Sequence, residues 1–592
     1  MPEPEDVALQ DLEADDQDER RHEGGADALD PPVQRGAEGV HPPQHLLHRQ
    51  RPPAAWAAAG ALGVLHPVDS GRGKWFLLRD VASNVNRRGP GERPVTAFRL
   101  TCPTCPETYR IEDGRFSCPR RGEAGDHLLR RLGLEGKAAA RAIACGWERA
   151  GAGSFLRLQA LFSARELAGE DGYRRIHDRL EEALAAREGT VFRVTPLLPQ
   201  PALAAALGRS GPLWVKDETG NVGGSHKGRH LFATLLYLEA LAARGDAPGK
   251  PELAIYSCGN AALAAAAVAR AGGYRLRAFV PADVDPRIAS LLEERGALVE
   301  RIARAQTGGG DPCYLAFREA LGRPGVLPFA CAGNDNWSNI EGGSGLGWEI
   351  VLALREHAAA VDHVVLQVGG AAFARAVAQA FEEAFSLGFL PRLPKIHACQ
   401  PEGGFPFVRG WALALAAYAA RGGVSAGIPC DRFAPPAEAL GRLAAFLRAE
   451  GPSLSPLVDR FAADFAGPAA RAVLAEIARR PGAFFWPWDG AAPQSLAHGI
   501  LDDLPYDGTG LLPAVLRTGG RAVILPEARI RSAWETARAA TGIPVCPTGA
   551  AGLAGLMELE AQGLLNPAES VLVVFTGRDR SADPPPKGPA TP

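Results

Sequence analysis

The stretch that decides the fold is Asp217-Glu218-Thr219-Gly220-Asn221-Val222-Gly223-Gly224-Ser225-His226-Lys227-Gly228-Arg229. The short apolar run Leu213-Trp214-Val215 precedes it, and a helical pattern from His230 to Leu236 follows it. This order of strand, Gly-rich turn and helix places Lys227 at a helix N-terminus, where unpaired backbone N–H groups and the positive end of the helix dipole lie. A lysine there presents a nucleophilic amine at a place that favours anions. The pattern alone is equally consistent with a surface lysine behind a flexible turn.

The same residues resemble the active-site lysine segment of the fold-type-II pyridoxal-phosphate enzymes. That family includes threonine synthase, the serine and threonine dehydratases, cysteine synthase and the tryptophan synthase β subunit. Its segment reads roughly Asn-x-Thr-Gly-Ser-x-Lys-x-Arg, and this chain has Asn221 to Arg229 in the corresponding places. The resemblance implies that Lys227 forms a Schiff base with pyridoxal 5'-phosphate and that His226, as in tryptophan synthase, lies beside the cofactor. Gly223 stands where many members carry threonine, so a substrate contact is not implied there.

Between about residues 191 and 580, short apolar runs alternate with helical patterns. The expected strands are Leu253 to Ser257, Arg277 to Val280, His363 to Val368, Lys395 to Cys399, Arg521 to Leu525 and Val571 to Phe575. Such alternation is typical of a parallel, doubly wound α/β sheet. The resemblance implies two open parallel subdomains with the cofactor in the cleft between them. It also implies that the smaller subdomain, residues 252–350, is mobile.

Two polar turns follow expected strands. Ser257-Cys258-Gly259-Asn260 precedes an Ala-rich helix, so its N–H groups could bind a carboxylate, although an ordinary helix cap fits the same pattern. By resemblance, Ser257 and Gly259 bind the substrate carboxylate and Asn260 contacts the cofactor ring hydroxyl. The second turn is Gly369-Gly370-Ala371-Ala372, where two glycines let backbone approach a phosphate at a helix N-terminus. The resemblance makes these four residues the phosphate cradle.

A last strand ends at Thr576-Gly577-Arg578. In the family, a serine or threonine at this place hydrogen-bonds the pyridine nitrogen of the cofactor, which implies this role for Thr576. Thr548, in a Gly/Ala-rich stretch that opens a helix, is the second candidate. A hydroxyl does not force the ring nitrogen to be protonated, which suits elimination and replacement at Cβ or Cγ.

The region before the catalytic domain carries four features. Residues 1–60 are polar and expected to be disordered. Residues 61–190 form an N-terminal extension with short strands near Trp75 to Leu78 and Thr96 to Leu100, followed by helices from 130 to 190. Its cysteines, Cys102-Pro103-Thr104-Cys105 and Cys118, resemble a degenerate zinc ribbon. Arg121 occupies the fourth ligand position, so we expect no metal, although three cysteines and a distant histidine could still bind zinc.

Residues 191–580 are the expected catalytic domain, with a mostly helical insertion near 430–480, and the Pro-rich tail 581–592 is expected to be disordered. A chain of 592 residues, 46% hydrophobic, can bury a sizeable core. The net charge of −3 does not favour nucleic acid or an anionic membrane as a partner. Ten scattered cysteines without a secretory signal favour a reducing compartment, and we expect a cytoplasmic homodimer acting on a small amino acid.

These features predict a pyridoxal-phosphate-dependent lyase or synthase, similar to threonine synthase or to serine/threonine dehydratase (ammonia-lyase). One alternative is a regulatory or partner protein that binds the cofactor without turnover, but such a protein does not need Lys227. Another is a nucleotide-dependent transferase. Against that alternative, neither Gly-rich turn has Gly-x-Gly-x-x-Gly spacing, and the Walker lysine pattern is missing from the sequence.

Overall fold

The structure is a computed structural model that describes residues 98–149, 151–245, 249–257, 259–303, 310–429, 436–490, 493–581 and 583. These residues belong to the second of two units, Arg79–Pro592. The expected disorder of residues 1–60 and of the tail beyond 583, and the strand expected at Trp75 to Leu78, lie outside the described residues. They remain predictions.

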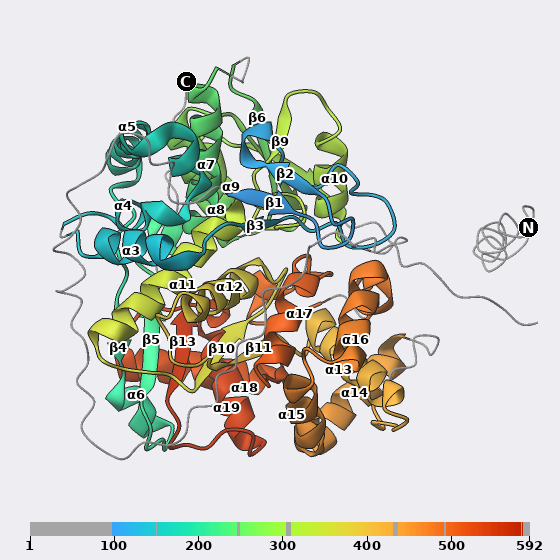
Figure 1. Ribbon diagram of the computed structural model, residues 1–592. Coiled ribbons are helices and arrows are strands. Elements are labelled where there is room, and N and C mark those ends of the chain that lie inside the picture. Colours follow the sequence, from blue (N-terminus) through green and yellow to red (C-terminus); the bar gives the residue numbers. More distant parts are fainter. Residues whose placement is uncertain are drawn as a thin grey trace, which may run out of the picture. The chain divides into compact units, whose positions relative to one another are not determined.

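A six-stranded sheet forms the centre of the larger subdomain (Figure 1). In spatial order its strands are β12 (Ala522–Leu525), β11 (Lys395–Pro401), β10 (His363–Gln367), β13 (Val571–Phe575), β5 (Leu213–Asp217) and β4 (Leu197–Pro199). All neighbours from β12 to β5 run parallel, and β4 pairs antiparallel at the edge. Every residue of β10 and β13 is buried, as expected of strands covered on both faces.

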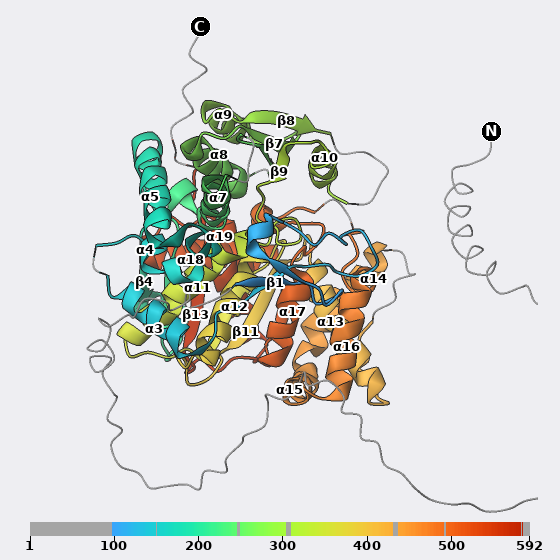
Figure 2. The same cartoon turned by 45° about the horizontal axis from the view of Figure 1, so that its top comes forward.

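A separate four-stranded parallel sheet forms the smaller subdomain, most easily seen in Figure 2. Its order is β8 (Leu298–Ile302), β7 (Leu276–Pro281), β6 (Glu252–Tyr256) and β9 (Val326–Pro328). The two open parallel sheets confirm the predicted fold class. Strands β8 and β9 were not predicted, because charged residues interrupt the first and the second is only three residues long.

Helices cover both faces of the larger sheet, and alternate residues of each strand enter different cores. Val364 and Leu366 of β10 join one hydrophobic cluster, whereas Val365 between them joins the other. This alternation is the two-residue period of a strand. The helices of the two subdomains are α6 (Pro201–Ala206), α7 (Lys227–Ala243), α8 (Asn260–Gly272), α9 (Pro286–Glu294), α10 (Pro312–Ala320), α11 (Asn339–Glu356), α12 (Ala372–Ser386), α13 (Pro406–Arg421), α17 (Gly508–Arg517), α18 (Glu527–Thr541) and α19 (Pro547–Ala561).

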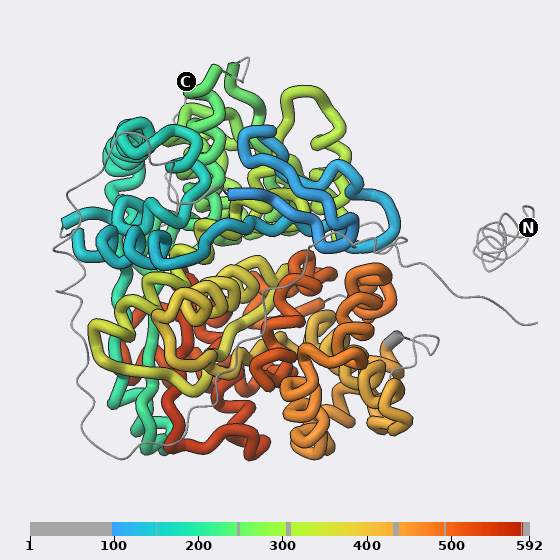
Figure 3. The backbone as a smooth tube through the Cα atoms, viewed as in Figure 1, coloured from blue at the N-terminus to red at the C-terminus, as the bar shows by residue number. Residues whose placement is uncertain are grey.

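The N-terminal extension begins with a small antiparallel sheet in which β1 (Arg99–Thr101) lies between β2 (Thr108–Arg110) and β3 (Arg130–Leu132). The expected helices follow as α3 (Gly136–Trp147), α4 (Ser154–Arg157) and α5 (Ser163–Glu188). In Figure 3 the first part of this extension runs across the region where the two subdomains meet.

The predicted helical insertion is present as α14 (Pro436–Glu450), α15 (Ser455–Ala463) and α16 (Pro468–Arg479). Helices α15 and α16 pack beside α13 and α17 of the larger subdomain, and α14 packs against β12. Among the described residues, no helix combines the length and apolar composition that crossing a membrane requires.

Candidate active site

One cavity of about 650 Å³ lies at the carboxyl ends of the central strands. Open α/β sheets bind ligands at this end. All the residues predicted to hold cofactor or substrate line it, namely His226, Lys227, Ser257, Gly259, Asn260, Gly369, Gly370, Ala371, Ala372 and Thr576. These residues come from separate stretches of sequence, and the fold brings them to one place.

Lys227 is the first residue of α7 and is half-buried. The turn before it includes Gly223 and Gly224, which adopt left-handed backbone angles with φ of 72° and 67°. The turn is fixed against the end of β13, because the backbone N–H of His226 donates to the Thr576 carbonyl at 3.0 Å. The Gly-rich sequence therefore allows a tight turn that sets Lys227 beside the last central strand.

His226 lies next to the cavity as a neutral ring. Burial and the neighbouring Lys227 charge hold the pKa of His226 well below its usual range. Its Nδ1 lies 3.1 Å from the Thr576 carbonyl and so carries the proton, while its buried Nε2 has no hydrogen-bond partner among the described residues. The ring packs against Phe373, with ring centroids 4.6 Å apart.

Lys216, on β5 close to the lysine turn in sequence, does not line the cavity. Its Nζ is fully buried and donates to Glu349 Oε2 and to the Thr195 carbonyl, each at 2.7 Å. Burial lowers the pKa of Lys216, against the opposing charge of Glu349. The geometry therefore favours Lys227 as the amine that a ligand can reach.

The turn Gly369 to Ala372 joins β10 to α12 in a strained conformation. Ala371 has φ of 73°, a left-handed angle that few residues other than glycine adopt. A Cβ at Gly369 would collide with Asp502 Oδ2, and one at Gly370 would lie 3.0 Å from the Tyr506 ring. Strain of this kind gathers at functional sites, and the open helix N-terminus after the turn favours an anion. The turn therefore fits a phosphate group.

Asp502 is a cavity residue that the sequence did not reveal. It lies in the segment 498–506, which follows the helical insertion, and it faces the Gly369–Gly370 turn. Burial raises the pKa of Asp502 to about 6, while the Lys227 charge and a hydrogen bond from the Gly370 backbone act in the opposite direction. An acidic oxygen thus already occupies the space beside the turn. In the sequence, Asp502 is followed by Asp503, and nothing in this short acidic segment predicts that it lies at the cavity.

Asn260 begins α8 and contacts a second unpredicted residue, Arg580. The Arg580 guanidinium hydrogen-bonds both Asn260 Oδ1 and the Gly223 carbonyl, so it ties the smaller subdomain to the lysine turn. In the neighbouring loop, the Gly259 N–H lies 3.3 Å from Ser257 Oγ. Arg580 was visible in the sequence only as part of a basic stretch after the last strand.

Thr576 is buried at the end of β13, with 3% of its surface exposed. Gln367 Nε2 donates to its Oγ1 at 2.8 Å, so the hydroxyl proton of Thr576 remains available to another acceptor. The Gln367 Oε1 atom is buried without a hydrogen-bond partner among the described residues. Thr548 also lines the cavity, and its Oγ1 accepts from the Gly499 N–H at 3.1 Å.

Comparison with known proteins finds one matching enzyme family and two related enzymes. Residues 190–443 match the family of pyridoxal-phosphate dependent enzymes. A threonine synthase of Synechocystis is 27% identical over 216 residues, which is 36% of this chain and 52% of that protein, so the match spans about half of its length. A threonine synthase of Methanosarcina acetivorans is 24% identical over 389 residues, covering 65% of this chain and 74% of that protein.

Solved structures with a similar arrangement include three pyridoxal-phosphate or amino-acid enzymes. An aspartate racemase has a TM-score of 0.45 and 16% identity and covers 69% of this chain and 97% of its own. A T.th. threonine deaminase has a TM-score of 0.44 and 20% identity, with coverage of 69% and 99%. Maize serine racemase has a TM-score of 0.43 and 16% identity, with coverage of 68% and 93%.

Proposed function

We propose, from the premise that this chain carries a pyridoxal-phosphate-dependent enzyme domain of fold type II, that it is a lyase or synthase acting at Cβ or Cγ of an amino acid. The observation that carries this proposal is the convergence of Lys227, the Gly369–Gly370 turn and Thr576 on one cavity. The two threonine synthase relatives favour a threonine synthase-like reaction, with a serine/threonine dehydratase-like reaction as the alternative.

Lining residues from four separate stretches of sequence would hold the cofactor. The N–H groups at the start of α12 would bind its phosphate, and Lys227 would bind its carbonyl carbon. Asn260 would contact the ring hydroxyl and Thr576 the ring nitrogen. When bound, pyridoxal phosphate supplies an electron sink for negative charge that develops at the substrate Cα.

The chain's own groups account for binding and proton transfer. The Ser257 side chain and the N–H groups of Gly259 and Asn260 would bind the substrate carboxylate at the N-terminus of α8. The Lys227 amine would take the Cα proton and return it later. The neutral Thr576 hydroxyl can donate or accept a hydrogen bond without fixing the charge of its partner, which suits elimination or replacement.

The volume of the cavity suits a small-molecule substrate such as an amino acid. A cavity of about 650 Å³ lies within the range of about 300–1,000 Å³ usual for small-molecule sites. One wall, including Tyr256 and Asn260, belongs to the smaller subdomain, and the opposite wall belongs to the larger one. Movement of the smaller subdomain would therefore open the cavity or exclude water from it.

The test uses the purified full-length chain loaded with pyridoxal phosphate. Borohydride reduction followed by peptide mapping should place the cofactor on Lys227, and attachment to Lys216 would contradict the assignment. The protein is then assayed with O-phosphohomoserine, serine, threonine and O-acetylserine. Phosphate release with threonine formation supports the synthase, and 2-oxoacid formation supports the dehydratase. Cofactor attachment without turnover of any of the four would favour a regulatory binding protein.

A further inference from the structure

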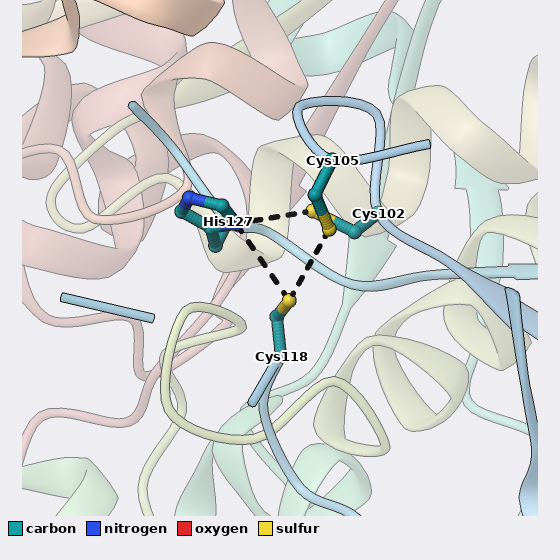
Figure 4. Close-up of side chains that lie close together, drawn as sticks. All are labelled: Cys102, Cys105, Cys118 and His127. Atoms are coloured by element: carbon teal, nitrogen blue, oxygen red, sulfur yellow. Dashed lines mark hydrogen bonds between the residues drawn. The ribbon is translucent and has the colours of Figure 1, made fainter. Parts of the chain in front are cut away.

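The N-terminal extension contains a second cluster of chemically reactive side chains, away from the cavity. Cys102, Cys105, Cys118 and His127 each offer one ligand atom, and these four atoms lie within 4.8 Å of one another (Figure 4). All four residues are buried. The cysteines sit on the loops that follow β1 and β2, and His127 precedes β3.

Three of the distances between ligand atoms match a tetrahedral zinc site. With Zn–S bonds of about 2.3 Å and a Zn–N bond of about 2.0–2.1 Å, tetrahedral geometry requires S···S edges of about 3.8 Å and S···N edges of about 3.6 Å. Cys105 Sγ lies 3.7 Å from Cys118 Sγ. His127 Nδ1 lies 3.6 Å from Cys102 Sγ and 3.7 Å from Cys118 Sγ. The four ligand atoms therefore enclose a space that fits one zinc ion.

His127 has no other role in the hydrogen bonding that the structure describes. Its side chain is 6% exposed, and its Nδ1 points at the sulfur atoms (Figure 4). Its Nε2 is buried without a hydrogen-bond partner among the described residues. A buried imidazole that contacts only thiols leaves polar atoms poorly satisfied. Coordination through Nδ1 would give that nitrogen a strong partner, and the ring proton would then lie on Nε2.

Arg121, which stands where a ribbon would have its fourth cysteine, is used differently. It turns toward the smaller subdomain, where it forms an ion pair with Asp335 and donates to Tyr314 Oη at 3.0 Å. The fourth ligand position is filled instead by His127, nine residues after Cys118. Arg121 made the set of ligands look incomplete in the sequence, but His127 completes it in the structure.

We propose that Cys102, Cys105, Cys118 and His127 bind one structural zinc ion. Four protein ligands close the coordination shell, so the site has no open position for a substrate. This proposal departs from the metal-free expectation drawn from the sequence, because the fold brings His127 to the three sulfurs.

A bound zinc ion would stabilise loops of the N-terminal extension that contact both subdomains. Asp126, next to His127, receives a hydrogen bond from Thr509 of α17 and donates its N–H to the Ala478 carbonyl of α16 at 2.7 Å. On the other side, Trp337 donates its ring N–H to the Arg115 carbonyl at 2.7 Å. The loops that carry the ligands thus contact the helical insertion and the smaller subdomain.

A series of contacts also connects the loops that carry the zinc ligands to the Gly369–Ala372 turn, which is the proposed phosphate site. Arg375 Nη2 donates to the Leu129 carbonyl at 3.1 Å, and its Nη1 pairs with Asp507. The Asp507 N–H in turn donates to the Gly370 carbonyl at 2.8 Å. Loss of zinc should therefore loosen the cofactor site as well as lower the stability of the fold.

The experiment measures metal in the full-length chain, purified without chelators from cells grown with added zinc. We expect about one zinc ion per chain, as a closed four-ligand site requires. The Cys118→Ser variant should lose it. The His127→Cys variant, which would complete a four-cysteine set, should keep it. The matched control is Cys145→Ser, because Cys145 lies on α3 outside the cluster.

A second measurement does not depend on the folding of variants. Wild-type chain produced with Co²⁺ in place of zinc should show the visible bands of a tetrahedral cobalt site together with thiolate-to-metal absorption. Absence of both zinc and this spectrum in the wild-type chain would overturn the proposal, as would full zinc content in a soluble Cys118→Ser variant. None of these readouts requires bound cofactor or turnover, so they are independent of the proposed reaction.

Discussion

Lys227 and Arg229 are two residues apart on the same helix but lie in opposite environments. Arg229 is 1% exposed, and its guanidinium contacts Glu218 Oε2 at 2.8 Å and Glu349 Oε1 at 2.7 Å. Burial would raise the pKa of Glu349, yet the charges of Arg229 and Lys216 hold it to about 2. Around Lys227, by contrast, Ser225 Oγ and His226 Nε2 are buried without hydrogen-bond partners among the described residues.

This difference distinguishes the Arg229 cluster, whose charges are paired and stabilise the fold, from the polar atoms around Lys227, which a ligand could pair with. A buried charge is tolerated when other groups compensate it, as they do around Arg229. Unpaired polar atoms beside a cavity have a cost that only a bound partner removes. Substitutions in one environment should therefore leave the properties of the other intact.

The largest effect is expected from Arg229→Met. Removing the guanidinium leaves two buried carboxylates without their main partner, and breaking such a cluster costs about 3–5 kcal/mol. Urea unfolding of the cofactor-free chain should show this loss in the free energy of unfolding. Arg531→Met is the control, because Arg531 is exposed on α18. Equal stabilities of the two variants would show that the Arg229 cluster does not hold the fold.

Lys227→Ala should remove nearly all activity and leave the stability of the fold nearly unchanged, which is the opposite of the effect expected for Arg229→Met. We expect loss of the borohydride-reducible bond and a fall in turnover of at least about 1,000-fold, because both the nucleophile and the proton carrier are removed. The midpoint of urea unfolding without cofactor should stay near the wild-type value. Lys216→Met provides the contrast and should lower stability while keeping the reducible bond. A reducible bond that survives in Lys227→Ala would identify another lysine.

Thr576→Val should have a moderate effect. The cofactor should still attach to Lys227, but turnover should fall about 10–100-fold, since leaving a buried polar group without its partner costs about 1–3 kcal/mol. Thr576→Asp should instead shift the partition between elimination and side reactions, because a carboxylate favours a protonated partner. Thr548→Val is the control, and a larger loss of turnover there would transfer the role of Thr576 to Thr548.

The sequence predicted much of this arrangement because the relevant signals are local. The strands around the cavity are short and mostly apolar, and the turns after them carry Gly and Asn at positions that a resemblance can match. Asp502 was not predicted, because it reaches the Gly369 turn from a segment more than about 100 residues later, beyond the helical insertion. His127 was not identified as a ligand for a different reason: it lies only nine residues after Cys118, but only the fold of the loop sets it against the cysteines.

The smallest effect is expected at Asp502, the cavity residue whose charge works against the proposed ligand. Its carboxyl group lies beside the turn that would hold the phosphate, so two negative groups would meet there once Asp502 ionises. Asp502→Asn should strengthen cofactor binding about 3–10-fold at pH 8, a modest gain because the Lys227 charge already offsets part of the repulsion. Equilibrium titration of the cofactor-free chain measures this. Asp283→Asn, on an exposed part of the cavity wall, should leave the affinity unchanged.

The pH dependence gives this last prediction its sign. Burial raises the pKa of Asp502 from 3.8 to about 6, so the fold favours the protonated acid. Its contribution to stability is complete below pH 3.8 and is lost as the pH rises through about 6. Over the same range the wild-type chain should lose cofactor affinity relative to Asp502→Asn. The phosphate itself ionises near pH 6, so the ratio of the two affinities is compared at each pH. A ratio that stays constant from pH 5 to pH 8 would show that Asp502 does not oppose the phosphate, and the carboxyl group beside the turn would then have no part in setting the affinity for the cofactor.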